Sequence, residues 1–146
     1  MESDNSESTR PQDKLIVIVD DDDSVRELLE FLVRKEGFNV ETAADGEEGL
    51  GKIQKLLPNL VILDLMLPRY GGFEILRQLQ QGETSRVPII IVTGRYTDRT
   101  TADMIRQESN VMDFLEKPIK ANMLAMSLHK ILKTSSPEMR AADGKQ

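Results

Sequence analysis

The sequence predicts an α/β fold in which five strands alternate with five helices around a parallel sheet. Three observations predict it. Short apolar runs alternate along the chain with amphipathic segments, which is typical of consecutive βαβ units. The main apolar runs stop at polar or charged residues, as buried strands do where they reach the edge of a sheet. The length of 146 residues, 39% of them hydrophobic, suits one domain with a core of its own.

The first βα unit is predicted from an aliphatic run and the stripe that follows it. Residues 15–19 are all aliphatic. Apolar residues then recur at helical spacing over 25–33, and Gly37 is placed to end that helix. The tetrapeptide Ser24–Glu27 fits a capping box for the start of the helix. Residues 38–42 alternate apolar with polar side chains, which predicts a strand with one wetter face at an edge of the sheet.

The middle of the chain continues the alternation. Asp45 is placed to cap a second helix, which stops before Pro58. The apolar run 59–63 ends at Asp64, so this acid is expected at the tip of a buried strand. A third helix is predicted from the apolar residues within 73–79.

The last two βα units differ in how clearly the sequence predicts a packed helix. A strand over 87–92 ends at Thr93, and residues 98–109 follow as a polar segment with few apolar positions. That helix is expected to be the least firmly held, because packing of an apolar face supplies most of a helix's stability. A strand near 111–116 and a helix over 124–132 complete the five units.

The methionines of this second half are predicted to fill the core rather than to form a surface for a partner. Flexible thioethers commonly fill irregular gaps between other side chains. The residues concerned are Met104, Met112, Met123 and Met126.

Composition excludes several classes of function. The chain has no cysteine, so thiolate metal sites and cysteine nucleophiles are excluded. Its net charge of −6 argues against a nucleic-acid-binding surface. No apolar stretch is long enough to cross a membrane, and no signal peptide is visible, so the expected location is the cytoplasm. Residues 1–13 and 134–146 are polar and predicted to be disordered tails, which leaves one domain over 14–133.

Acids, a hydroxyl and an amine are predicted to converge where the parallel strands end. Asp20, Asp21 and Asp64 at about 4 Å from one another would repel by roughly 4 kcal/mol per ionised pair at an effective dielectric near 20, so such a cluster needs a cation. Oxygen-only ligands open to water suit Mg²⁺ or Mn²⁺. Lys117 and Thr93 can hold phosphoryl oxygens. The set therefore indicates phosphoryl transfer to a carboxylate, with Asp64 as nucleophile.

These residues, taken in order, resemble the receiver domain of the response regulators of two-component signalling. The resemblance covers about residues 14 to 133. It implies a (βα)₅ flavodoxin-like, doubly wound parallel sheet with strand order 2-1-3-4-5 and phosphorylation of Asp64 by a histidine kinase or phosphotransfer protein. The segments that carry it are Val19-Asp20-Asp21, Leu63-Asp64, Leu67-Pro68, Gly72, Thr93-Gly94 and Lys117-Pro118.

The resemblance also implies a role for each site residue. Asp21, Asp64 and the backbone carbonyl of Met66 would coordinate Mg²⁺, and Asp20 would act mainly through a bound water. Thr93 and Lys117 would grip the phosphoryl oxygens.

Three further side chains have implied regulatory roles. Phe114 takes the place of a switching aromatic together with Thr93, and its lack of a hydroxyl means that such a switch rests on packing. Met66 and Arg95 would flank the path of the hydrolytic water. Neither orients water, which predicts slow self-dephosphorylation.

Two rival interpretations stay open at this stage. The run Asp20–Ser24 after a strand also resembles the start of haloacid dehalogenase-like phosphatases, but no acidic pair follows Lys117 and that reading leaves Asp64 unexplained. A receiver-like interaction module without phosphotransfer is the other. We expect a stand-alone receiver without an output domain, with no dedicated enzyme activity beyond self-phosphorylation and slow self-dephosphorylation, that signals by contact with an unidentified downstream protein.

Overall fold

A parallel five-stranded sheet forms the centre of the computed structural model, which describes residues 8–68, 71–94, 99–108 and 110–137. The strands lie in the order β2-β1-β3-β4-β5, and every neighbouring pair is parallel. This is the predicted doubly wound order. The strands are β1 (Leu15–Val19), β2 (Asn39–Ala43), β3 (Leu60–Asp64), β4 (Ile89–Thr93) and β5 (Val111–Glu116).

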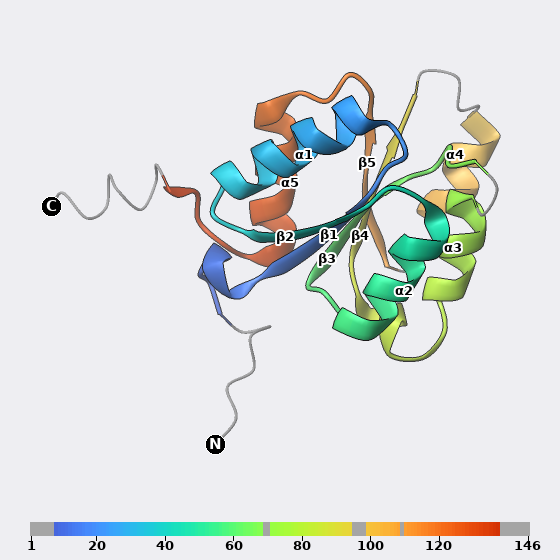
Figure 1. Ribbon diagram of the computed structural model, residues 1–146, viewed down its shortest axis with the longest axis horizontal. Coiled ribbons are helices and arrows are strands. Elements are labelled where there is room, and N and C mark those ends of the chain that lie inside the picture. Colours follow the sequence, from blue (N-terminus) through green and yellow to red (C-terminus); the bar gives the residue numbers. More distant parts are fainter. Residues whose placement is uncertain (1–7, 69–70, 95–98, 109, 138–146) are drawn as a thin grey trace, which may run out of the picture.

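Helices cover both faces of this sheet (Figure 1). On one face lie α1 and α5, and on the other lie α2, α3 and α4. In the described part of the chain, the α-helices are α1 (Asp23–Lys35), α2 (Gly46–Leu56), α3 (Gly72–Leu79), α4 (Arg99–Arg106) and α5 (Ala121–Leu132), and the 3₁₀ helices are η2 (Pro11–Asp13) and η3 (Gly82–Arg86). Within the described ranges, no helix has the length and apolar character needed to cross a membrane.

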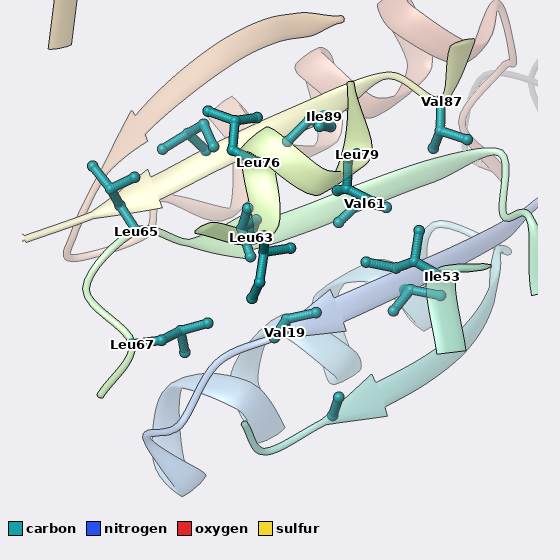
Figure 2. Close-up of a cluster of buried hydrophobic side chains, with 14 of the residues drawn as sticks. Val19, Ile53, Val61, Leu63, Leu65, Leu67, Leu76, Leu79, Val87 and Ile89 are labelled. Atoms are coloured by element: carbon teal, nitrogen blue, oxygen red, sulfur yellow. The ribbon is translucent and has the colours of Figure 1, made fainter. Parts of the chain in front are cut away.

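The two faces of the sheet carry separate hydrophobic cores. Alternate strand residues point to opposite faces, so Val61 and Leu63 pack under α2 and α3 whereas Leu60 and Ile62 pack under α1 and α5. Figure 2 shows the first of these clusters, where Leu76 and other side chains of α3 lie over β3 and β4. The central strands are therefore buried on both faces, which fixes the positions of their ends.

The start of α1 differs from the predicted capping box. The N-cap is Asp22, whose carboxylate accepts a hydrogen bond from the backbone N–H of Val25 at 3.1 Å, and Ser24 lies inside the first turn. The prediction was wrong because only three residues separate the end of β1 from the start of α1. The helix therefore begins earlier than predicted, and the side chain of Asp22 reaches the free N–H groups of its first turn. Asp45 caps α2 as predicted, and Gly37, with φ of 100°, follows α1 in the left-handed conformation that glycine favours.

The prediction for the methionines was also wrong. Met104, Met112, Met123 and Met126 are between 51% and 68% exposed. Branched aliphatic side chains fill both cores instead, since they pack densely with fewer conformers to lose. Met112 also lies where the pairing of β5 with β4 shifts register, between the partners of Ile89 and Ile90.

Part of the predicted N-terminal tail packs on the domain. Pro11 of η2 is buried, and the side-chain amide of Asn39 donates a hydrogen bond to the backbone carbonyl of Gln12 at 2.6 Å. Residues 1–7 and 138–146, the outer parts of the two predicted tails, lie outside the described residues.

Candidate functional site

The ends of four strands bring the predicted site residues to one edge of the sheet. Asp20 directly follows β1, Asp64 is the last residue of β3, Thr93 is the last residue of β4, and Lys117 directly follows β5. The register places these ends side by side, because Val19 pairs with Leu63, Asp64 with Val92, and Thr93 with Glu116. We call Asp20, Asp21, Asp64, Thr93 and Lys117 the acid edge.

Three carboxylates meet at the acid edge. Asp20, Asp21 and Asp64 each offer an oxygen, and these oxygens lie within 4.8 Å of one another. Asp20 and Asp64 are almost fully buried, whereas Asp21 is exposed. The cluster is therefore closed on the protein side and open to solvent through Asp21.

The ammonium of Lys117 faces two of these acids. Its Nζ lies 3.2 Å from Oδ2 of Asp20 and 3.4 Å from Oδ2 of Asp64. The backbone N–H of Lys117 donates a 2.7 Å hydrogen bond to the carbonyl of Thr93, and the peptide bond to Pro118 is cis. The β4–β5 pairing thus extends to the residue that carries the positive charge.

Burial and charge displace two pKa values at the acid edge. Burial raises the pKa of Asp20 above its ordinary value, and the charge of Asp64 adds to that rise against the hydrogen bond from Asp22 and the charge of Lys117. Burial alone would lower the pKa of Lys117, but the carboxylates of Asp20 and Asp64 outweigh burial and raise it. One ammonium therefore holds its proton firmly while a buried acid ionises reluctantly.

The donor set fits a divalent cation. Oδ2 of Asp20 is buried and makes no hydrogen bond, although Lys117 lies within ion-pair distance of it, and it is the one such buried side-chain atom in the described part of the chain. A buried oxygen without a hydrogen bond is costly unless another group satisfies it. Carboxylate oxygens at an edge open to water are the ligands that Mg²⁺ and Mn²⁺ prefer.

The turn after β3 holds the Asp64 carboxylate in place. Its Oδ1 accepts a hydrogen bond from the backbone N–H of Met66 at 3.0 Å, and its Oδ2 faces Lys117. Gly72 allows α3 to begin against this turn, because a Cβ there would lie 2.7 Å from the carbonyl oxygens of Asp64 and Leu65. The glycine is thus required by a close approach of two backbone segments.

Arg26 supports the site and was missed by the sequence analysis. Its guanidinium donates a 2.9 Å hydrogen bond to the backbone carbonyl of Asp20 and pairs with Asp23 at 2.6 Å. The N–H of Asp22 binds Oδ1 of Asp20 at 2.9 Å, so Asp20 is held through both its backbone and its side chain. Arg26 lies in the first turn of α1, where a positive charge is unfavourable because it opposes the helix dipole. A cation at such a position indicates that it has a specific partner, and this signal could have identified Arg26 in the sequence.

Met66 and Phe114 contribute no side chain to the carboxylate cluster, although the backbone N–H of Met66 binds Asp64. The side chain of Met66 is 65% exposed. Phe114 lies on β5 two positions before Glu116 and is partly buried. Arg95 lies outside the described residues, so its predicted role stays a prediction.

A doubly wound parallel α/β domain with acids and a lysine at the carboxyl edge of its strands has these groups where open α/β sheets place their ligands. The chain belongs to the response regulator receiver domain family, whose sequence model matches residues 16–129. It is therefore a receiver domain of two-component response regulators, and the haloacid dehalogenase-like alternative is not favoured.

Several curated proteins are similar to this chain. It is 33% identical over 123 residues to the transcriptional regulatory protein AfsQ1 of Streptomyces coelicolor, with 84% of this chain and 53% of that protein covered. It is 37% identical over 123 residues to the DNA-binding response regulator MtrA of Mycolicibacterium smegmatis, with 84% and 52% covered. The chain thus spans about half the length of the curated relatives it matches.

Solved structures agree with this assignment. The receiver domain of NtrX from Brucella abortus is 30% identical with a TM-score of 0.74, over 82% of this chain and 99% of that one. A CheY-like receiver domain protein from Methanospirillum hungatei is 29% identical with a TM-score of 0.74, over 82% and 94%. The fold of this chain is therefore the receiver fold.

Proposed function

We propose that the acid edge accepts a phosphoryl group on Asp64. The observation that carries this proposal is the position of Asp64, buried beside Lys117 and within a cluster of carboxylates. In the transfer, an Asp64 oxygen bonds to phosphorus while the bond from phosphorus to the donor breaks. The bonding electrons leave with the donor, which is a histidine nitrogen of a kinase or phosphotransfer protein, or an acetate oxygen of acetyl phosphate.

The residues around Asp64 have distinct parts in this proposal. Asp21, Asp64 and the backbone carbonyl of Met66 hold Mg²⁺ or Mn²⁺, with Asp20 contributing mainly through a bound water. When bound, the cation neutralises the charge that develops on the phosphoryl oxygens. Lys117 keeps its proton and attracts a phosphoryl oxygen, and Thr93 donates to another. Arg26 holds Asp20 so that its oxygens stay directed toward the cluster.

The phosphorylated domain signals by contact with another protein. Lys117 and Thr93 lie on neighbouring strand ends and are joined through the backbone, so a phosphoryl group held by both draws the ends of β4 and β5 together. The packing of Phe114 on β5 then changes. The upstream partner is a histidine kinase, as for response regulators in general, and the downstream partner is a protein that recognises the changed surface.

Intact-mass spectrometry after treatment with acetyl phosphate and Mg²⁺ tests the proposal. We expect one labile phosphoryl group on the wild-type chain and none on Asp64→Asn. The matched control is Asp103→Asn, which removes an exposed acid of α4 and should be labelled like wild type. A wild-type chain that stays unlabelled would favour an interaction module without phosphotransfer.

The phosphatase alternative gives a different result in the same experiment. Such an enzyme attacks through the first aspartate of its motif, so it would still be labelled in Asp64→Asn and would lose labelling in Asp20→Asn. It would also release phosphate continuously from a phosphate ester such as p-nitrophenyl phosphate. We expect no such release above background.

A further inference from the structure

Phe114 lies on the same face of the sheet as Thr93. Phe114 pairs with Ile91 and Glu116 pairs with Thr93, and residues two apart on a strand point to the same face. Phe114 packs against the core cluster that includes Ile91 and Ile105, which lies under α2, α3 and α4. Thr93 and Phe114 are therefore diagonal neighbours, so a displacement of Thr93 changes the space beside the ring.

Two hollows of the surface have Phe114 in their lining. One hollow of about 410 Å³ lies toward α4 and is lined by Arg106, Val111, Met112, Asp113 and Phe114. Another of about 390 Å³ lies toward α5 and is lined by residues 114–120 and Met123. Close-packed side chains are restrained on all sides, whereas Phe114 is partly buried and lies at the hollow beside α4.

Arg106 occupies the outer side of this ring. Its guanidinium carbon lies 5.0 Å from the centroid of Phe114, within the distance at which a cation is attracted to a ring face. The contact with this ring is the one side-chain interaction of Arg106 within the described ranges, and the side chain is exposed. The ring is thus the one partner of this guanidinium in the described part of the chain.

The helix that carries Arg106 has few other attachments. Ile105 is the one buried side chain among those described on α4, and Met104 beside it is 64% exposed. We call α4 (Arg99–Arg106) together with Phe114 the α4 side. Two neighbouring residues, Ile105 in the core and Arg106 on the ring, therefore hold the last turn of α4 against β5.

We infer that Arg106 is a positioning residue that holds Phe114 between α4 and β5 in the unphosphorylated chain and so restrains the switch. The inference rests on the proposed function, in which Thr93 moves toward the phosphoryl group. Any contact that exists only in the resting state biases the equilibrium toward that state. A partly exposed cation–π contact changes such an equilibrium about two- to fivefold.

Fluorine NMR of protein labelled with 4-fluorophenylalanine tests where the ring lies. The chain has four phenylalanines, and the Phe114 signal is identified by its loss in Phe114→Leu. With Mg²⁺ alone, we expect the Phe114 signal of Arg106→Gln to move part of the way toward its position in wild type bound to beryllofluoride, a phosphoryl mimic. Arg99→Gln removes an exposed cation from the first turn of the same helix and should leave the signal in place.

Beryllofluoride affinity tests whether the contact restrains the switch. Arg106→Gln should bind beryllofluoride about two- to fivefold more tightly than wild type, and Arg106→Lys, which keeps the cation, should bind nearly as wild type does. In a Phe114→Leu background, Arg106→Gln should have no further effect. If Arg106 had a merely structural role, the effect of Arg106→Gln on beryllofluoride affinity would remain in the Phe114→Leu background.

The outcomes separate this inference from the proposed function. An unmoved Phe114 signal, or an equal movement in Arg99→Gln, overturns the positioning role of Arg106. An Arg106→Gln affinity effect that persists without the Phe114 ring overturns it as well. A wild-type chain that binds no beryllofluoride overturns the proposed function instead, while the signal in Mg²⁺ alone still tests the contact.

Discussion

The acid edge and the α4 side differ in how firmly the fold holds them. The three acids and Thr93 of the acid edge lie at the ends of β1, β3 and β4, whose hydrophobic residues next to them are fully or almost fully buried, and Lys117 follows the less buried β5. Among the described residues of α4, Ile105 is the one buried side chain, and Arg106 makes a cation–π contact with Phe114 of β5. Transfer chemistry needs groups that keep their positions, and a switch needs an element that moves at low cost. The difference therefore separates the reacting part of the domain from its responding part.

Adding a methyl group at Gly72 should disturb the acid edge most. The new Cβ of Gly72→Ala would lie 2.7 Å from backbone atoms of Asp64 and Leu65 that cannot rotate away. We expect the free energy of unfolding, measured with urea, to fall by about 2–3 kcal/mol. Gly51→Ala is the matched control, because no atom lies within 4 Å of its added Cβ, and it should raise that free energy by about 0.5–1 kcal/mol. Similar effects of the two substitutions would contradict this account of the turn.

Removing Ile105, the one buried side chain among those described on α4, should release that helix without unfolding the sheet. We expect Ile105→Ala to abolish amide-exchange protection over α4 while β1 and β3 stay protected, at a global cost of about 2 kcal/mol. Ile75→Ala on α3 is the comparison, since Ile75 is fully buried beneath a well-packed helix. It should lower protection throughout the domain. Equal loss across the domain in both variants would mean that α4 is not a separate unit.

The buried acid of the site should destabilise the metal-free fold. Asp20→Asn removes one of the clustered charges, so we expect the free energy of unfolding without Mg²⁺ to rise by about 1 kcal/mol or more. Added Mg²⁺ should raise the melting temperature of the wild type, measured by calorimetry across a Mg²⁺ titration. At a hundredfold excess of Mg²⁺ over Kd, the gain in the free energy of unfolding is about 2.7 kcal/mol. Asp103→Asn should melt like wild type. An unchanged wild-type midpoint would contradict a cation site.

The same residue gives the pH dependence a definite sign. The pKa of Asp20 is raised in the folded state from an ordinary value of 3.8. The folded chain therefore binds this proton more tightly, and the stabilising contribution of Asp20 is present below 3.8 and lost as pH rises through its folded-state pKa. Without Mg²⁺, the advantage of Asp20→Asn over wild type should grow across that interval. An advantage that shrinks with rising pH would reverse the assigned sign.

Met66 and Arg95 are expected to tune the lifetime of the phosphorylated state by a smaller amount. The Met66 side chain is exposed beside Asp64 and has no group that orients water. We expect Met66→Asn combined with Arg95→Glu to shorten the phosphorylated state several-fold, in the direction of general-base assistance. Phosphate loss after donor removal, at fixed Mg²⁺, measures it. Equal or slower decay in the double variant would show that other groups control access of water.

Local patterns predicted the sheet and the acid edge because both follow from strands. A run of aliphatic residues that ends at an acid fixes where that acid lies once the strands are parallel, as for Asp20 and Asp64. The wrong prediction for the methionines and the failure to identify Arg26 have another cause. Whether Met112 faces the core depends on a register shift between β4 and β5. The sequence marks Arg26 only as a cation at a helix start, and it does not show that one partner is the backbone carbonyl of Asp20.

Locating the phosphoryl group chemically tests the central claim most directly. Borohydride reduces an aspartyl phosphate to homoserine, so peptide mass spectrometry of protein treated with acetyl phosphate, Mg²⁺ and then borohydride identifies the acceptor. The account predicts homoserine in place of Asp64, dependent on Mg²⁺, with Asp20 and Asp21 unmodified. Homoserine at Asp20 or Asp21, or modification of Asp64 that is unaffected by removal of Mg²⁺, would contradict it.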